Sequence, residues 1–201
     1  MKKNKLGISV LSVGILIASA SLFFIFTQDS SRSTELNDSK ISLEASYVTY
    51  ETVSALDSGA ELIVIGTPLR DFDDRKHIVT TFDDGALQDF YTLTDIQVDE
   101  VIKAPKDSTL AADEALTIIE PISYIEGAEG KRKITFEDYT ELKQNEKSII
   151  FLKQNSQGEY SVINMDLGKF SLESTSQFLG TSKTQDSKEK FRQSVLEKYN
   201  L

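Results

Sequence analysis

The feature that most constrains this chain is an uncharged run of 21 residues near its start, from Leu6 to Phe26. At about 1.5 Å rise per residue, a helix of this length spans the roughly 30 Å hydrocarbon core of a bilayer. Lys2, Lys3 and Lys5 precede the run, and positive residues of this kind mark the cytoplasmic side of a membrane segment. We therefore expect a single-pass transmembrane anchor, with residues 1–5 in the cytoplasm and everything after the run outside the cell membrane.

A cleaved secretory signal is the alternative interpretation of the same run. Ala18, Ser19 and Ala20 fit the small-residue pattern of a cleavage site, and cleavage after Ala20 would release a secreted protein. It would also leave the apolar residues 22–26 at the new N-terminus, which favours the uncleaved anchor. The chain has no cysteine, which excludes a lipoprotein anchor, disulfides and thiolate metal sites.

The rest of the chain divides into a spacer and one domain. Residues 27–42 are rich in Ser, Asp, Asn, Thr and Lys and predict a flexible polar spacer. Residues 43–201 are the size of one extracytoplasmic domain. The net charge of −10 becomes −13 when Lys2, Lys3 and Lys5 are left out. Such acidity argues against nucleic acid as a partner and is compatible with basic partners.

Helical patterns occur only near the two ends of this domain. Apolar residues at helical spacing predict a short helix over 50–58, with Thr49 as its N-cap and Gly59 closing its end. A capping box opened by Asp186 predicts a C-terminal helix over about 186–200.

Between the two helices the chain has the pattern of short β-strands, one of which is conspicuously long. Gly66 predicts a bulge or a close backbone approach. In the long strand the apolar phase shifts near Asp99 or Glu100, which predicts a second bulge. The expected strands are 60–67, 76–82, 90–103, 116–120, 131–136, 148–153, 160–164 and 168–172.

This arrangement predicts a mainly β fold. A long strand that carries bulges must coil, and coiled strands close small barrels. We expect a small antiparallel OB-like barrel of five or six strands, with a short N-terminal helix and a C-terminal helix. A β-sandwich is the alternative.

Residues 60–172 resemble a poorly characterised class of exported proteins of Gram-positive bacteria. The resemblance rests on four segments in order, which are 61–67, 91–103, 146–152 and the glycine-phenylalanine strand 168–170. The same order is similar to that of netrin-like and metalloproteinase-inhibitor OB barrels, whose animal members are stapled by disulfides that this chain cannot form. The resemblance implies a small β-barrel more than an activity.

Two acidic turns are the part of the domain that offers the most reactive or metal-binding side chains. They contain Asp71, Asp73 and Asp74 before the predicted strand 76–82, and Asp83 and Asp84 after it. A strand of that length would hold the two clusters roughly 20 Å apart. Each cluster alone offers carboxylate oxygens to calcium, but neither has the spacing of an EF-hand loop, and turns favour Asp for backbone reasons.

The remaining candidates indicate no reaction. His77 is the only histidine, and beside Arg75 and Lys76 it is expected on the surface of a strand. No nucleophile motif accompanies it. The basic run 131–133 is expected to be a solvated turn, with docking of an anionic wall polymer as the alternative.

The sequence therefore assigns no catalytic residue and no cofactor. It favours a membrane-anchored binding or interaction module whose partner, a protein or a wall polymer, is unknown, and it indicates no nucleic acid partner. Two alternatives stay open, namely a cell-envelope hydrolase that uses the carboxylates of the Asp-rich loops, and a structural subunit of an envelope complex.

Overall fold

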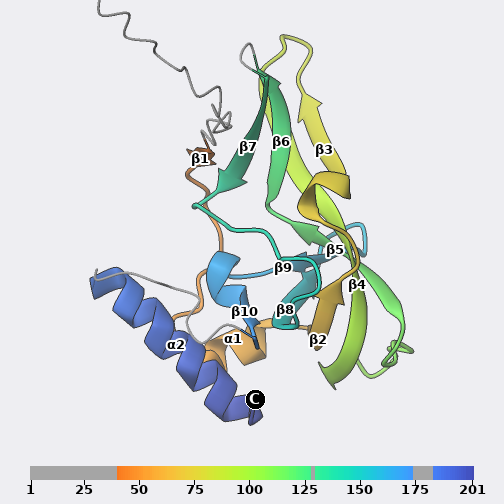
Figure 1. The fold of residues 1–201 in the computed structure, drawn as a ribbon, viewed down its shortest axis with the longest axis vertical. Coiled ribbons are helices and arrows are strands. Elements are labelled where there is room, and N and C mark those ends of the chain that lie inside the picture. The colour runs from red at the N-terminus through yellow and green to blue at the C-terminus, as the bar shows by residue number, and fades with distance from the viewer. Residues whose placement is uncertain (1–39, 128–129, 174–182) are drawn as a thin grey trace, which may run out of the picture. The chain divides into compact units, whose positions relative to one another are not determined.

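The computed structural model of the chain describes residues 40–127, 130–173 and 183–201 (Figure 1). The predicted membrane segment 6–26, the cleavage motif at 18–20 and most of the predicted spacer lie outside these residues. Within the three described stretches, no helix combines the length and the hydrophobicity needed to traverse a bilayer.

The described residues form a mainly β fold with two α-helices. The helices are α1 (Val53–Gly59) and α2 (Lys183–Tyr199). The strands are β1 (Ile41–Leu43), β2 (Leu62–Pro68), β3 (Lys76–Thr81), β4 (Leu87–Lys103), β5 (Ala115–Glu120), β6 (Ile122–Gly127), β7 (Gly130–Phe136), β8 (Ser148–Gln154), β9 (Tyr160–Val162) and β10 (Lys169–Ser171). Two 3-10 turns accompany them, η1 (Phe72–Asp74) and η2 (Met165–Gly168).

Five of the strands close into a barrel, which confirms the predicted class of fold. The hydrogen-bonded order is β2, β4, β5, β9 and β8, and β8 pairs again with β2. Strand β3 extends the barrel sheet by pairing with the first half of β4, and β10 extends it by pairing with β8 (Figure 1). The expected antiparallel pairing is observed for four of the five strand pairs of the barrel, whereas β5 pairs with β9 in parallel.

The long strand β4 closes the barrel by the bulges that its sequence predicts. Its register with β2 shifts between the pairs Ile65–Glu100 and Gly66–Val98, which leaves Asp99 as the extra residue. Gly66 lies at this shift, and a Cβ atom there would come within 2.8 Å of Cδ1 of Ile96. Both predicted bulges are therefore one local feature, in which a glycine allows the close approach of two strands.

A second sheet with the order β1, β7, β6 was only partly predicted. The expected strand 116–120 ends at Glu120, as β5 does, but the chain turns at Pro121 and begins β6 at Ile122, where the sequence predicts no strand. Strand β1 contains Ile41 and Ser42, the last two residues of the range predicted as a spacer, and it pairs in parallel with β7. A three-residue strand in a polar context has no pattern of its own, since its partner lies more than 90 residues away.

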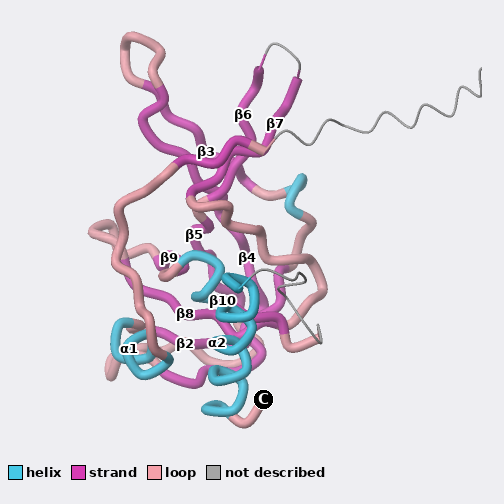
Figure 2. The backbone as a smooth tube through the Cα atoms, turned by 90° about the vertical axis from the view of Figure 1, so that its left-hand side faces the viewer, coloured by secondary structure: helices cyan, strands magenta, loops and turns pink. Residues whose placement is uncertain are grey.

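Alternate residues of β2 and β8 are buried on opposite sides, as their continuous apolar runs predicted. Inside the barrel, Leu62, Val64 and Ile150 belong to one apolar cluster. On the outside, Ile63 and Phe151 belong to a second cluster, which is covered by α1 and α2 (Figure 2).

The observed helix boundaries differ from the predicted ones. Helix α1 begins at Val53, because the Thr52 hydroxyl, and not that of Thr49, accepts the hydrogen bond from the Ala55 amide. Gly59 serves close packing, since a Cβ atom there would lie 2.3 Å from the ring of Tyr50. Helix α2 begins three residues before the predicted start at 186.

Candidate binding groove

A hollow in the described surface lies where β4, β5 and β9 meet the turn between β8 and β9. It has a volume of about 450 Å³. The strands contribute Tyr91, Ile119 and Ser161 to its lining, and the turn contributes Gln157 and Glu159. Tyr91 is more than 60 positions from the residues of the turn and of β9, and the closure of the barrel brings them together.

Strand register explains why these side chains share one outer face. Leu93 pairs with Ile119 in β5, and Ile119 pairs with Ser161 in β9. Tyr91 lies two residues before Leu93 and therefore points to the same side of the sheet. The residues between them, Thr92 among others, are fully buried on the inner side. The outer face is thus a continuous half-buried surface across three strands.

The β8–β9 turn that overhangs this surface is held by its own hydrogen bonds. Oδ1 of Asn155 accepts from the amides of Gln157 and Glu159 at 3.0 and 2.9 Å. Gly158 has φ +84°, a conformation that glycine adopts without a steric penalty. The turn therefore places the Glu159 carboxylate on the hollow in a defined position, with one hydrogen bond to it from the Asn155 amide.

A second hollow of about 180 Å³ lies beside the first on the same outer face. Its lining includes Arg70 and Lys76 at the start of β3, and Leu93, Asp95 and Thr117 on β4 and β5. Because Leu93 of this hollow is paired with Ile119 of the larger one, the two hollows are neighbours. We call the combined surface the outer groove. The charged and apolar lining residues considered below are Arg70, Lys76, Asp89, Tyr91, Leu93, Ile119 and Glu159.

The charged side chains of the outer groove form no ion pair within the described part of the chain. There, neither Arg70 nor Lys76 forms an ion pair, and no cation pairs with Asp89 or Glu159. The Asp89 carboxylate accepts only the amide of Phe90, at 2.8 Å. The groove therefore has a basic end near β3, an acidic end near the β8–β9 turn, and an apolar middle.

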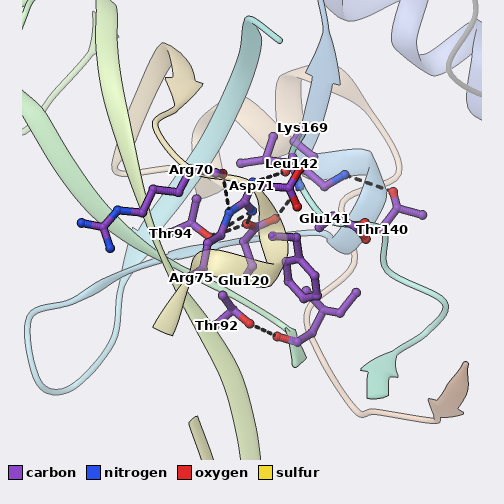
Figure 3. A network of polar contacts seen from close by, with 12 residues as sticks. Arg70, Asp71, Arg75, Thr92, Thr94, Glu120, Thr140, Glu141, Leu142 and Lys169 are labelled. Atoms are coloured by element: carbon purple, nitrogen blue, oxygen red, sulfur yellow. Dashed lines mark hydrogen bonds and ion pairs between the residues drawn. The ribbon is translucent and has the colours of Figure 1, made fainter. Parts of the chain in front are cut away.

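A buried polar network fixes the basic end of the groove to the barrel (Figure 3). Nη1 of Arg75 donates to Oε1 of Glu120 at 2.8 Å, and the two side chains are 2 % and 0 % exposed. Oε1 also accepts from the Thr94 hydroxyl, while Oε2 accepts from the Tyr139 hydroxyl and the Leu142 amide. All four lone-pair directions of this carboxylate are therefore used, which is what burial of a charge requires.

The other nitrogens of Arg75 hold two loops. Nε donates to the carbonyl of Arg70 at 3.1 Å, and Nη2 donates to the carbonyl of Leu142 at 2.6 Å. The Arg70 side chain leaves this network and points away from it (Figure 3). Burial, together with the adjacent Glu120 carboxylate, raises the pKa of Tyr139 well above its usual value, so this phenol remains a donor. The network thus positions Arg70 without neutralising it.

His77 lies on β3 as expected, but its side chain is half-buried, whereas that of the neighbouring Lys76 is exposed. Its Nε2 is 2.9 Å from the carbonyl oxygen of Phe72, and its Nδ1 is 2.9 Å from Oγ1 of Thr92. Its ring contacts those of Phe72 and Tyr124 edge-on or tilted. Burial lowers the pKa of His77 from its ordinary value, although the hydrogen bond to the Phe72 carbonyl opposes the shift. The histidine joins η1 to the barrel.

The aspartates considered as calcium ligands lie at opposite ends of β3 and are not brought together. Asp71 caps η1 by accepting from the Asp73 amide, and Asp73 accepts from the Tyr124 hydroxyl. Asp84 accepts from the Ala86 amide in the β3–β4 turn. Asp74 and Asp83 are exposed. No group of three or more His, Cys, Asp or Glu side chains in the described stretches is arranged to hold a metal ion.

The basic run 131–133 is more ordered than a solvated turn. The Lys131 ammonium lies 3.9 Å from the centre of the Tyr124 ring, and Lys133 forms a 2.8 Å ion pair with Glu141.

Comparison of the chain with protein-family models, with curated proteins and with solved structures found no match. The resemblance to exported Gram-positive proteins therefore stays a prediction. A function has to be inferred from the residues of the outer groove.

Sequence reasoning did not find the outer groove. Its only local signal is that Tyr91 and Leu93 are apolar although they alternate with the buried residues Phe90, Thr92 and Thr94. A strand that is apolar on both faces needs a cover on each. Within the described chain no helix or loop covers the outer face.

Proposed function

We propose that this protein is an extracytoplasmic binding module, held at the membrane by residues 6–26, that receives its ligand in the outer groove. The observation that carries the proposal is a half-buried apolar surface, flanked by unpaired charges, on a rigid barrel. Loops that are positioned by such a scaffold are common places for recognition.

The connectivity of the barrel supports this choice of face. Numbered along the chain, the five barrel strands follow the order 1-2-3-5-4-1 with strands 3 and 5 parallel, which is the order of an OB fold. Barrels of that type bind ligands on strands 2 and 3, between the loops that join strands 1 to 2 and 4 to 5. The outer groove occupies this place, with residues 69–75 at one end and 155–159 at the other.

Charge narrows the ligand class. OB barrels that bind nucleic acid present a positive groove with several stacking aromatic rings. The groove described above has an acidic end and one partly exposed aromatic side chain, Tyr91, since Phe90 in the same lining is 1 % exposed, and the chain has a net charge of −10. We therefore propose a ligand other than nucleic acid.

Site-specific photo-crosslinking in the full chain, in intact cells, tests the proposal. A photoreactive residue at Tyr91 is expected to give a light-dependent adduct of defined mass, because this position lies in the middle of the groove. The matched control is Glu197, an exposed residue on α2 far from the groove in sequence and fold. Equal adduct patterns at the two positions, or none at Tyr91, would contradict a ligand in the groove.

Membrane anchoring is tested separately by fractionation and N-terminal sequencing of the mature protein. We expect the chain in the membrane fraction with Leu6–Phe26 retained. A mature N-terminus at Ser21 would show instead a secreted binding module.

A further inference from the structure

The two ends of the outer groove carry opposite charges, and this arrangement points to one class of ligand. From it we infer that the groove binds an extended polypeptide segment, with acidic side chains toward Arg70 and Lys76, apolar side chains over Tyr91, Leu93 and Ile119, and basic side chains toward Asp89 and Glu159. The inference rests on the proposed function and specifies its ligand.

The length of the groove suits a short peptide. Asp89 and Asp95 mark the two ends along β4, and six residues of an extended strand cover about 20 Å. About six or seven residues of an extended ligand therefore bridge the acidic and basic ends, and alternate side chains would face the groove.

The apolar middle provides the area that such a segment needs. Tyr91, Leu93 and Ile119 are half-buried and adjacent by register. An apolar side chain placed there excludes water from both partners, which is favourable in proportion to the area covered. The charged ends then select the register and orientation, because opposite charges across an interface favour one arrangement and disfavour the others.

Arg70 and Lys76 have no ion pair within the described chain, which supports a ligand with acidic side chains. Elsewhere in the same domain, long cationic side chains find carboxylates, as Lys133 does with Glu141 and Lys147 with Asp99, both at 2.8 Å. Arg70 and Lys76 line the same hollow as Asp95, which accepts from the Thr117 hydroxyl at 2.6 Å, but neither cation forms an ion pair with it, and two cations face one carboxylate there. The two cations are thus available to a ligand carboxylate.

Other polymers fit the same groove less well. An anionic wall polymer would meet Asp89 and Glu159 at one end. A neutral glycan would leave the charges of the groove without partners and would find one partly exposed aromatic ring in the lining, that of Tyr91, because Phe90 is 1 % exposed. A polypeptide can present both charges and an apolar centre in one short segment.

A random seven-residue peptide library, displayed on phage and selected on the full chain in detergent micelles, tests the inference. We expect enriched sequences with acidic residues at one end, apolar residues in the centre and basic residues at the other end. A parallel selection uses the double variant Arg70→Glu/Lys76→Glu, which should enrich basic residues at both ends. Peptides from the first selection should bind this variant about tenfold more weakly, as expected for two reversed charges.

The matched control is the double variant Lys106→Glu/Lys188→Glu, which changes the same net charge at lysines that do not line the groove. It should enrich the same peptides as the unmodified chain. Identical enrichment on the groove variant and the unmodified chain, or enriched peptides without opposite charges, would overturn the inference.

Soluble glycan strands of the cell wall, freed of their peptides, form the second arm. If they shift the NMR signals of Tyr91 and Ile119 while no peptide is enriched, the ligand is a glycan, so the inference fails and the proposed function stands. If neither probe binds and Tyr91 gives no crosslink in cells, both fail.

Discussion

The barrel has two outer faces that use similar apolar strands for opposite purposes. The face formed by β2, β8 and β10 is covered, because Leu56 of α1 and Val195 of α2 pack on Phe151 and Phe170. The face formed by β4, β5 and β9 is open and contains the outer groove. One sheet surface therefore contributes to cohesion, while the other remains available for a ligand.

The charges follow the same division. On the covered side, Lys103 donates to the carbonyls of Asp57 and Ala60, and the Asp57 carboxylate also accepts from Lys198 and Tyr199. On the open side, Arg70 and Lys76 have no ion pair in the described chain. Within the described chain, paired charges accompany the face that the two helices close, and charges without an ion pair accompany the open face.

The largest expected effect comes from the network that holds the open face in shape. Glu120→Ala removes the carboxylate that pairs with Arg75 in its buried site and leaves the guanidinium without this ion pair. We expect a loss of about 3–5 kcal/mol in the free energy of unfolding, measured by urea denaturation. Glu126→Ala, at an exposed position on β6, is the control and should stay within about 0.5 kcal/mol. A small loss in Glu120→Ala would mean that the network does not support the groove.

The next effect concerns the cover of the closed face. Leu56 is the one fully buried residue of α1. Leu56→Ala should lower the free energy of unfolding by about 2–4 kcal/mol, because it leaves a cavity against Phe151 and Phe170. Ser54→Ala on the exposed side of the same helix should change it by less than about 0.5 kcal/mol. Equal effects of the two substitutions would show that α1 does not seal this face.

A smaller effect, dependent on pH, comes from Asp57. Burial pushes the pKa of Asp57 upward, but hydrogen bonds from Lys198, Tyr199 and Lys103 outweigh it, so the net shift is downward from the usual value. A lowered pKa contributes stability that is present above the unfolded-state pKa of about 4 and is lost as the pH falls through the folded-state pKa.

Asp57→Asn should therefore cost about 0.5–1 kcal/mol near pH 7, the usual range for a partly exposed pair. The difference from the unmodified chain should shrink below pH 4, as followed by urea denaturation across pH. Asp107→Asn, on an exposed loop residue, is the control. A difference that does not change with pH would argue against the ion pair as its source.

Local sequence patterns predicted the covered face of β2 and β8 better than the open face of β4, β5 and β9. The continuous apolar runs 62–65 and 149–152 require cover on both sides, and this requirement is visible in the sequence itself. The bulge at Asp99 was likewise predicted, since a shift in apolar phase along one strand needs no knowledge of its partner. Strand β6 was missed because Pro121 stops one strand and leaves the following residue free to begin another.

The outer groove could not be predicted in the same way. It exists only because the parallel pairing of β5 with β9 carries the β8–β9 turn to the side of Tyr91. That pairing joins residues about 40 positions apart and has no signature in either strand. The buried pair of Arg75 and Glu120 was equally hidden, because 45 positions separate two residues whose types are usually exposed.

The smallest effect on stability is expected for a lysine of the open face, Lys76, which we compare with Lys103 on the covered face. Lys76→Ala removes an exposed cation without an ion pair in the described chain, so the free energy of unfolding should change by less than about 0.5 kcal/mol. Lys103→Ala removes a cation that joins β4 to α1 through Asp57 and Ala60, and it should cost about 1 kcal/mol.

Crosslinking through Tyr91 should show the reverse order. Lys76→Ala should lower the adduct yield, because it removes one of the two cations at the basic end of the groove, whereas Lys103→Ala should leave the yield unchanged. Stability and ligand capture would then separate onto the two faces. A variant of either lysine that altered both quantities together would show that the covered face and the open face are not independent, and that the groove changes shape when the helices loosen.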